Sequence, residues 1–146
     1  MSNKIKQYHK STVTGLLGKN GDEKVKVITD IGLDVDAFKI GWVSGQFHHS
    51  QSSEWIQGFA EAKILIEANG NHKNGGVSYG CFGNKGYVFP LLGEGGAQEN
   101  LFAFYPNSHN KQPEFLNNYG LFPRYPKAKT ERLFILNDVI STASLI

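Results

Sequence analysis

Histidines carry most of the side chains in this sequence that could transfer protons near neutral pH. His48 and His49 are adjacent in a polar stretch that continues through Ser53. An imidazole there could act as a general base, because its pKa lies close to neutrality. His109 could return the proton, and Lys85 could neutralise a phosphate. This set predicts, as an alternative function, a small toxin-like hydrolase or ribonuclease. The spacing matches no metal-binding motif, so no metal is expected.

The single cysteine, Cys81, is the other candidate nucleophile. A reactive thiol needs a setting that lowers its pKa, such as a helix N-terminus or a neighbouring cation. Its neighbours, Tyr79-Gly80 and Phe82-Gly83, resemble a strand instead. We therefore expect a buried or half-buried strand cysteine. One cysteine also excludes an intramolecular disulfide.

Tyrosines and amides between residues 105 and 125 form the preferred candidate site. Tyrosine combined with amide and arginine side chains is typical of surfaces that bind sugars, nucleobases or proteins. The sequence therefore predicts a non-enzymatic binding or assembly protein that contacts a small polar ligand, a glycan or a protein partner, with homo-oligomers as one form of assembly. No cofactor is expected. The predicted ligand-binding residues are Tyr105, Asn107, His109, Tyr119, Arg124 and Tyr125.

Charge is uneven along the chain, although the formal net charge is only +2. Residues 1–26 carry six lysines against two acids, whereas residues 30–67 are acidic. The acidic segment favours a further alternative, an inhibitor or immunity protein that covers a basic partner. The small net charge argues against a nucleic-acid partner.

The elements that must hold these residues read as mainly β-structure. Seventeen glycines and eighteen aromatics favour turns and pleated surfaces. Asn20-Gly21 predicts the turn of a first hairpin, and 83–86 the turn of a second. Further strands are expected at 38–47, 99–105 and 131–140, with a short helix near 114–118. The fold class expected is an antiparallel sandwich or barrel with one or two helices.

Residues 53–69 leave a second fold class open. Ser53 and Glu54 resemble a helix start, whereas the apolar residues from Ala60 to Ala68 alternate with strand period. A helix at 53–69 would make the protein α+β. The length fits a single domain over 1–146, with residues 1–10 as a flexible basic arm. No segment is apolar enough for a signal peptide or a membrane helix, so a cytoplasmic protein is expected, although export without a cleaved signal or production by a virus would leave the same sequence.

Overall fold

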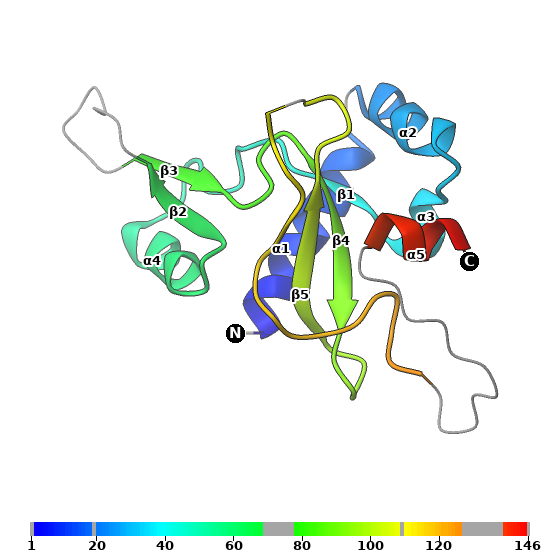
Figure 1. Ribbon diagram of the computed structural model, residues 1–146. Helices are drawn as coiled ribbons and strands as arrows, with labels where there is room; N and C mark the ends of the chain where they lie inside the picture. Colours follow the sequence, from blue (N-terminus) through cyan, green and yellow to red (C-terminus); the bar gives the residue numbers. More distant parts are fainter. Residues whose placement is uncertain (1, 19, 69–77, 109, 127–138, 146) are drawn as a thin grey trace.

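The computed structural model describes residues 2–18, 20–68, 78–108, 110–126 and 139–145, and they form an α+β fold (Figure 1). An antiparallel sheet stands at its centre, with helices on both sides. In chain order the elements are α1 (Ser2–Leu16), α2 (Gly21–Asp30), α3 (Val35–Phe38), β1 (Gly41–Trp42), α4 (Ser53–Glu61), β2 (Leu65–Ala68), β3 (Ser78–Cys81), β4 (Tyr87–Leu92), β5 (Gln98–Phe104), β6 (Glu114–Phe115) and α5 (Val139–Leu145).

The central sheet has the strand order β1-β4-β5-β6, and β2 pairs with β3 in a separate two-stranded sheet. The smaller sheet lies with α4 at one side of the molecule (Figure 1). The long β4–β5 hairpin forms the middle of the central sheet. Its register pairs Val88 with Ala103 and Phe89 with Phe102.

Pro90 occupies an unusual place in β4. On the edge of β4 away from β5, β1 pairs with Tyr87 and Val88, and Leu92 exchanges two backbone hydrogen bonds of 2.9 Å with Leu121. Alternate residues of a strand direct their backbone groups to the same edge, so Pro90 faces this edge between the two pairings. Proline has no N–H to donate there.

Each face of the β4–β5 hairpin packs into its own apolar cluster. Val88 and Leu101 pack with residues of α1 and α4, including Tyr8 and Phe59. The opposite face, which includes Phe89, packs with residues of α2 and α5 and of the α2–β1 connection. Helices therefore cover both faces of the sheet, which is why the fold is not a sandwich.

Helix α1 covers the first face because its apolar residues recur with helical spacing. Its buried side chains are Ile5, Tyr8, His9, Thr12 and Leu16. This is the i, i+3, i+4, i+7 pattern of a helix with one buried face. Residues 2–10, which we expected to be an arm, lie within this helix.

The prediction of a mainly β sandwich or barrel is therefore wrong, and the α+β alternative is confirmed. The Asn20-Gly21 turn exists, since Asn20 has a φ of 66°, but it joins α1 to α2 rather than two strands. The two segments on either side of Asn20-Gly21, which the hairpin prediction treats as strands, are the helices α1 and α2. Tertiary packing of their apolar faces outweighs the β propensity of valine and threonine.

Residues 53–69 contain both structures that the sequence left open. A helix runs from Ser53 to Glu61, and the Ser52 side chain accepts a hydrogen bond from the Trp55 N–H at 3.2 Å. Lys63 then takes a left-handed conformation with a φ of 63°. The alternating residues that follow form β2, so the period changes within the segment.

Later elements agree with the sequence only in part. The strand expected at 99–105 is β5, and the turn at 83–86 is present. That turn connects β3 to β4, which belong to different sheets, so the hairpin prediction is wrong. The short helix expected at 114–118 is also wrong, because β6 begins there, and of the segment 38–47 only Gly41–Trp42 is a strand. Most of the strand expected at 131–140 lies outside the described residues.

None of the helices in the described ranges is long and apolar enough to cross a membrane.

Candidate functional site

In the described residues, the predicted catalytic histidines and lysine are not brought together in one site. The rings of His48 and His49 are 4.9 Å apart, and His48 Nδ1 lies 3.6 Å from Cys81 Sγ. Burial, reinforced by His49, lowers the pKa of His48. The Lys85 ammonium instead donates to the Ser44 carbonyl at 2.8 Å. His109 lies outside the described residues.

Cys81 is the buried strand cysteine that the sequence predicts. It ends β3 and is 6% exposed. Burial raises the pKa of its thiol, so the thiol stays protonated near neutral pH.

The predicted tyrosine and amide surface is divided by the fold. Tyr105 is buried, and its hydroxyl donates to Glu114 Oε1 at 2.8 Å. Asn107 and Arg124 are exposed. Tyr119 and Tyr125 also keep exposed rings, at 68% and 37%. Each of these exposed side chains is available to a ligand, whereas Tyr105 is not.

The largest hollow described here, about 540 Å³, is basic. It lies between the first turns of α1, the end of α3, the β4–β5 hairpin and residues 122–124. We call it the basic hollow. Its lining residues are Asn3, Lys6, Ala37, Phe38, Lys39, Pro90, Leu92, Gly96, Ala97, Gln98, Phe122, Pro123 and Arg124.

Positive charge in the basic hollow is uncompensated by its own walls. Lys6, Lys39 and Arg124 are all exposed, and no aspartate or glutamate lines the hollow. Within the described residues, none of the three has a carboxylate within salt-bridge distance; Lys26 and Asp30 form the ion pair found there. Cations held together without carboxylates attract anions such as phosphate.

Lys39 is held in the basic hollow by its backbone. The Asp34 side chain begins α3 by accepting hydrogen bonds from Asp36 N–H and Ala37 N–H, at 3.0 and 3.1 Å. The helix ends at Phe38, and Lys39 follows it with a left-handed φ of 52°. The His9 Nε2–H donates to the Lys39 carbonyl at 2.6 Å. This bond offsets part of the strain that a non-glycine residue carries in that conformation.

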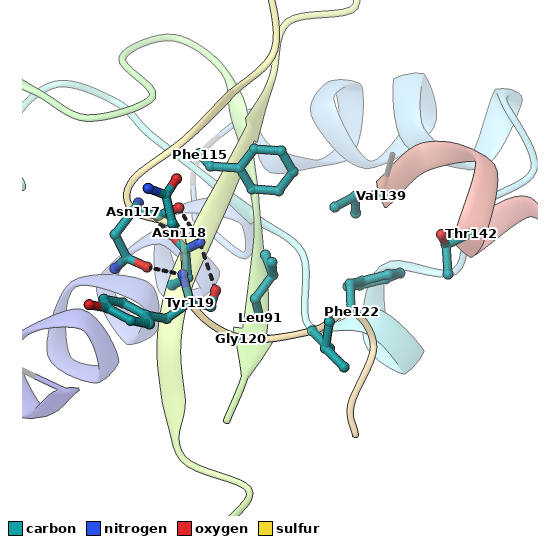
Figure 2. Close-up of a pocket in the computed structure, with 11 residues that line it drawn as sticks. Leu91, Phe115, Asn117, Asn118, Tyr119, Gly120, Phe122, Val139 and Thr142 are labelled. Carbon is teal, nitrogen blue, oxygen red and sulfur yellow. Dashed lines mark hydrogen bonds between the residues drawn. The ribbon is translucent and has the colours of Figure 1, made fainter. Parts of the chain in front are cut away.

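A second hollow of about 300 Å³ is lined by residues 117–122 and by parts of β4, β5, β6 and α5 (Figure 2). Its walls are mainly apolar, with Leu91 at the base, Phe115 on one side, and Phe122 and Val139 on the other. We call it the apolar hollow. Its remaining lining residues are Asn100, Asn117, Asn118, Tyr119, Gly120, Leu121 and Thr142.

Asn100 fixes the polar rim of the apolar hollow. It is 1% exposed, and its side-chain N–H groups donate to the carbonyls of Asn117 and Tyr119 at 2.7 and 2.9 Å. Its side-chain oxygen accepts from the Asn117 N–H at 2.9 Å. Asn100 was not among the predicted site residues, because it follows Gln98 and Glu99 at the polar start of its strand and nothing in the sequence distinguishes it from them.

No group of three or more histidine, cysteine or acidic side chains in the described part of the chain could hold a metal ion.

This arrangement of helices and sheet is similar to part of the fold of primase catalytic domains. The E. coli primase catalytic core matches with a TM-score of 0.63 and 14% identity, over 83% of this chain and 39% of that one. A DnaG primase catalytic domain bound to single-stranded DNA matches with a TM-score of 0.62 and 13% identity, over 78% and 37%. The RNA polymerase domain of Mycobacterium tuberculosis DnaG, in complex with double-stranded DNA carrying an overhang, matches with a TM-score of 0.55 and 11% identity, over 80% and 38%.

At these identities the likeness shows a shared fold. The chain spans less than two fifths of the length of each of these primase chains. No protein-family model matches the chain, and no curated protein matches its sequence.

The shared fold corrects two predictions. The prediction of a non-enzymatic binding or assembly protein, with its hydrolase and immunity alternatives, is contradicted because the neighbours are primase catalytic domains. The argument against a nucleic-acid partner is contradicted because two of those neighbours hold DNA. The small net charge was a poor guide to a nucleic-acid partner because it is a sum over the whole chain. It does not show that the fold brings several cations together in one hollow.

Proposed function

We propose that this chain binds single-stranded DNA as the strand-binding part of a primase-like protein. The observation that carries the proposal is the basic hollow, where Lys6, Lys39 and Arg124 gather without a lining carboxylate. The likeness to a primase catalytic domain bound to single-stranded DNA supports the same ligand. That the chain is a single domain and works in the cytoplasm is part of this proposal.

The basic hollow offers each kind of contact that a DNA backbone uses. The three cations neutralise phosphates, and the amides of Asn3 and Gln98 can donate hydrogen bonds to phosphate or sugar oxygens. These contacts carry no sequence information. Binding by this hollow is therefore expected to be independent of sequence and strongly dependent on salt.

Fluorescence anisotropy with a labelled single-stranded oligonucleotide tests the proposal. The triple variant Lys6→Gln, Lys39→Asn, Arg124→Gln removes the charges of the hollow, and asparagine suits the left-handed backbone at position 39. Each phosphate neutralised on a single strand contributes about 0.7 to the slope of log K against log salt. We expect the variant to bind more weakly and to lose about 2 from that slope.

A matched control removes the same number of positive charges at positions outside the basic hollow. The triple variant Lys26→Gln, Lys85→Asn, Lys111→Gln also removes three cations, and Lys85 has a left-handed φ of 60° like Lys39. None of these lysines lines the basic hollow. If both triple variants lowered affinity and slope equally, binding would not be located in the hollow, and absence of salt-dependent binding by the unaltered protein would refute the proposal.

A further inference from the structure

The apolar hollow has the character of a binding pocket for something flat and partly polar. Its volume of about 300 Å³ lies at the small end of the range for ligand sites. Phe115 is 47% exposed and packs against Phe102 with ring centroids 5.0 Å apart, so it is a supported ring with a free face. Such a ring can stack on an aromatic ligand.

Hydrogen-bonding groups at the rim of the apolar hollow suit a nucleobase. The Asn118 side chain is exposed, and it has no hydrogen-bond partner in the described structure. An amide carries both a donor and an acceptor, which complement the mixed edge of a base. Because Asn100 holds the backbone of 117–119, this rim is formed before any ligand arrives.

Phe122 connects the two hollows. Its side chain lines both, and Arg124, two residues further on, lines the basic hollow. Leu91 lines the apolar hollow, and its neighbours Pro90 and Leu92 line the basic hollow, so both hollows border the end of β4 and meet at Phe122. A flexible single strand can bend around this residue, whereas a duplex is too stiff.

From this geometry we propose that the apolar hollow receives one unpaired nucleobase of the strand whose phosphates lie in the basic hollow. The inference rests on the proposed function and adds a contact to the base itself. Stacking on Phe115 and hydrogen bonding to Asn118 would make binding depend on the presence of bases, with little preference among them.

An abasic oligonucleotide separates this base contact from the phosphate contacts. It keeps the sugar–phosphate backbone of a normal strand of equal length and lacks the bases. By anisotropy, we expect the unaltered protein to bind the normal strand about tenfold more tightly, with the same salt slope for both. Equal affinity for the two strands would overturn the base pocket and leave the proposed function standing. Salt-dependent binding of neither strand would overturn both.

Variants locate the effect. Asn118→Ala removes an exposed amide without a partner, and Phe115→Leu keeps an apolar wall while removing the ring. The double variant is expected to reduce binding of the normal strand severalfold and to leave the abasic strand unchanged. Ile66→Ala, at a residue 56% exposed and outside both hollows, is the control. A partner other than a base would be indicated if the double variant changed binding of both strands equally.

Discussion

Asn100 shows how much one buried amide can organise. It bonds the backbone at Asn117 and Tyr119, and its oxygen also accepts from the Leu101 N–H at 2.8 Å. Asn100→Ala would remove the partners of the buried Leu101 N–H and of the partly buried backbone groups of Asn117 and Tyr119, so we expect a loss of about 2–4 kcal/mol in the free energy of unfolding. Urea denaturation measures it. Asn107→Ala, at an exposed residue, is expected to change stability by less than about 0.5 kcal/mol. A similarly small effect of Asn100→Ala would contradict the stabilising role of the Asn100 hydrogen bonds.

His9 links the stability of the protein to pH. Burial lowers its pKa, while the hydrogen bond to the Lys39 carbonyl acts in the opposite direction without cancelling the shift. The unfolded chain therefore binds the proton more readily than the folded protein does. The contribution of His9 to stability is fully present above the unfolded pKa of 6.5 and decreases as the pH falls below that value.

We therefore expect the free energy of unfolding to decrease from pH 7.5 to pH 5.5, by up to about 1.4 kcal/mol from His9 alone. Urea denaturation at the two pH values measures this. His9→Gln keeps a donor for the Lys39 carbonyl and removes the titration, so its stability should depend less on pH. Since the pKa of His48 is lowered too, both proteins are compared in a His48→Asn background. An unchanged pH dependence in His9→Gln would show that His9 is not responsible.

At the scale of elements, the junction of α1 and α2 depends on the absence of a side chain. Gly21 is buried, and a Cβ added there would collide with the Leu16 carbonyl oxygen. Alanine normally stabilises a helix by up to about 1 kcal/mol relative to glycine, but the collision opposes this. We expect Gly21→Ala to destabilise the protein by about 1–3 kcal/mol in urea denaturation. Gly18→Ala, where the added atom stays 3.4 Å from the nearest backbone, should be tolerated; equal effects would rule out the collision.

The same junction shows what the sequence can and cannot predict about elements. Asn20-Gly21 is a local signal, and its turn is correctly predicted. Whether the turn connects helices or strands depends on packing. The helical spacing of Ile5, Tyr8 and Leu16 stabilises a helix only because these side chains pack against the β4–β5 hairpin. The same limit applies at 83–86, where the turn is correct and the pairing of its flanking strands is not.

On the whole-molecule scale, the candidate site was only partly predictable. Arg124 and Tyr119 attract attention as polar and aromatic residues of one loop, and each lines a hollow. Lys39 carried no local signal, and Lys6 carried only that of a lysine-rich start, because the two join Arg124 only when α1, α3 and the hairpin come together. Long-range juxtaposition of this kind leaves no spacing in the sequence to detect.

Binding of DNA should stabilise the molecule as a whole. A ligand that binds only the folded state, at a hundred times its Kd, contributes about 2.7 kcal/mol. For a domain of this size we expect single-stranded DNA at that concentration to raise Tm by roughly 5–10 °C at low salt. Thermal unfolding followed by circular dichroism measures the shift. High salt, or the triple variant at Lys6, Lys39 and Arg124, should abolish it, and a shift that persisted in both would indicate another site.

Pro90 has a consequence for what the sheet could tolerate in its place. It is buried, and it stands between the pairings of β4 with β1 and with Leu121. Any other residue would bring a backbone N–H to this point, and a buried N–H without a partner costs about 1–3 kcal/mol. We expect Pro90→Val to lower the free energy of unfolding by about that amount. Urea denaturation measures the change, and an unchanged stability would contradict it. The proline would thereby close the gap between the two pairings without leaving a hydrogen-bond donor inside it.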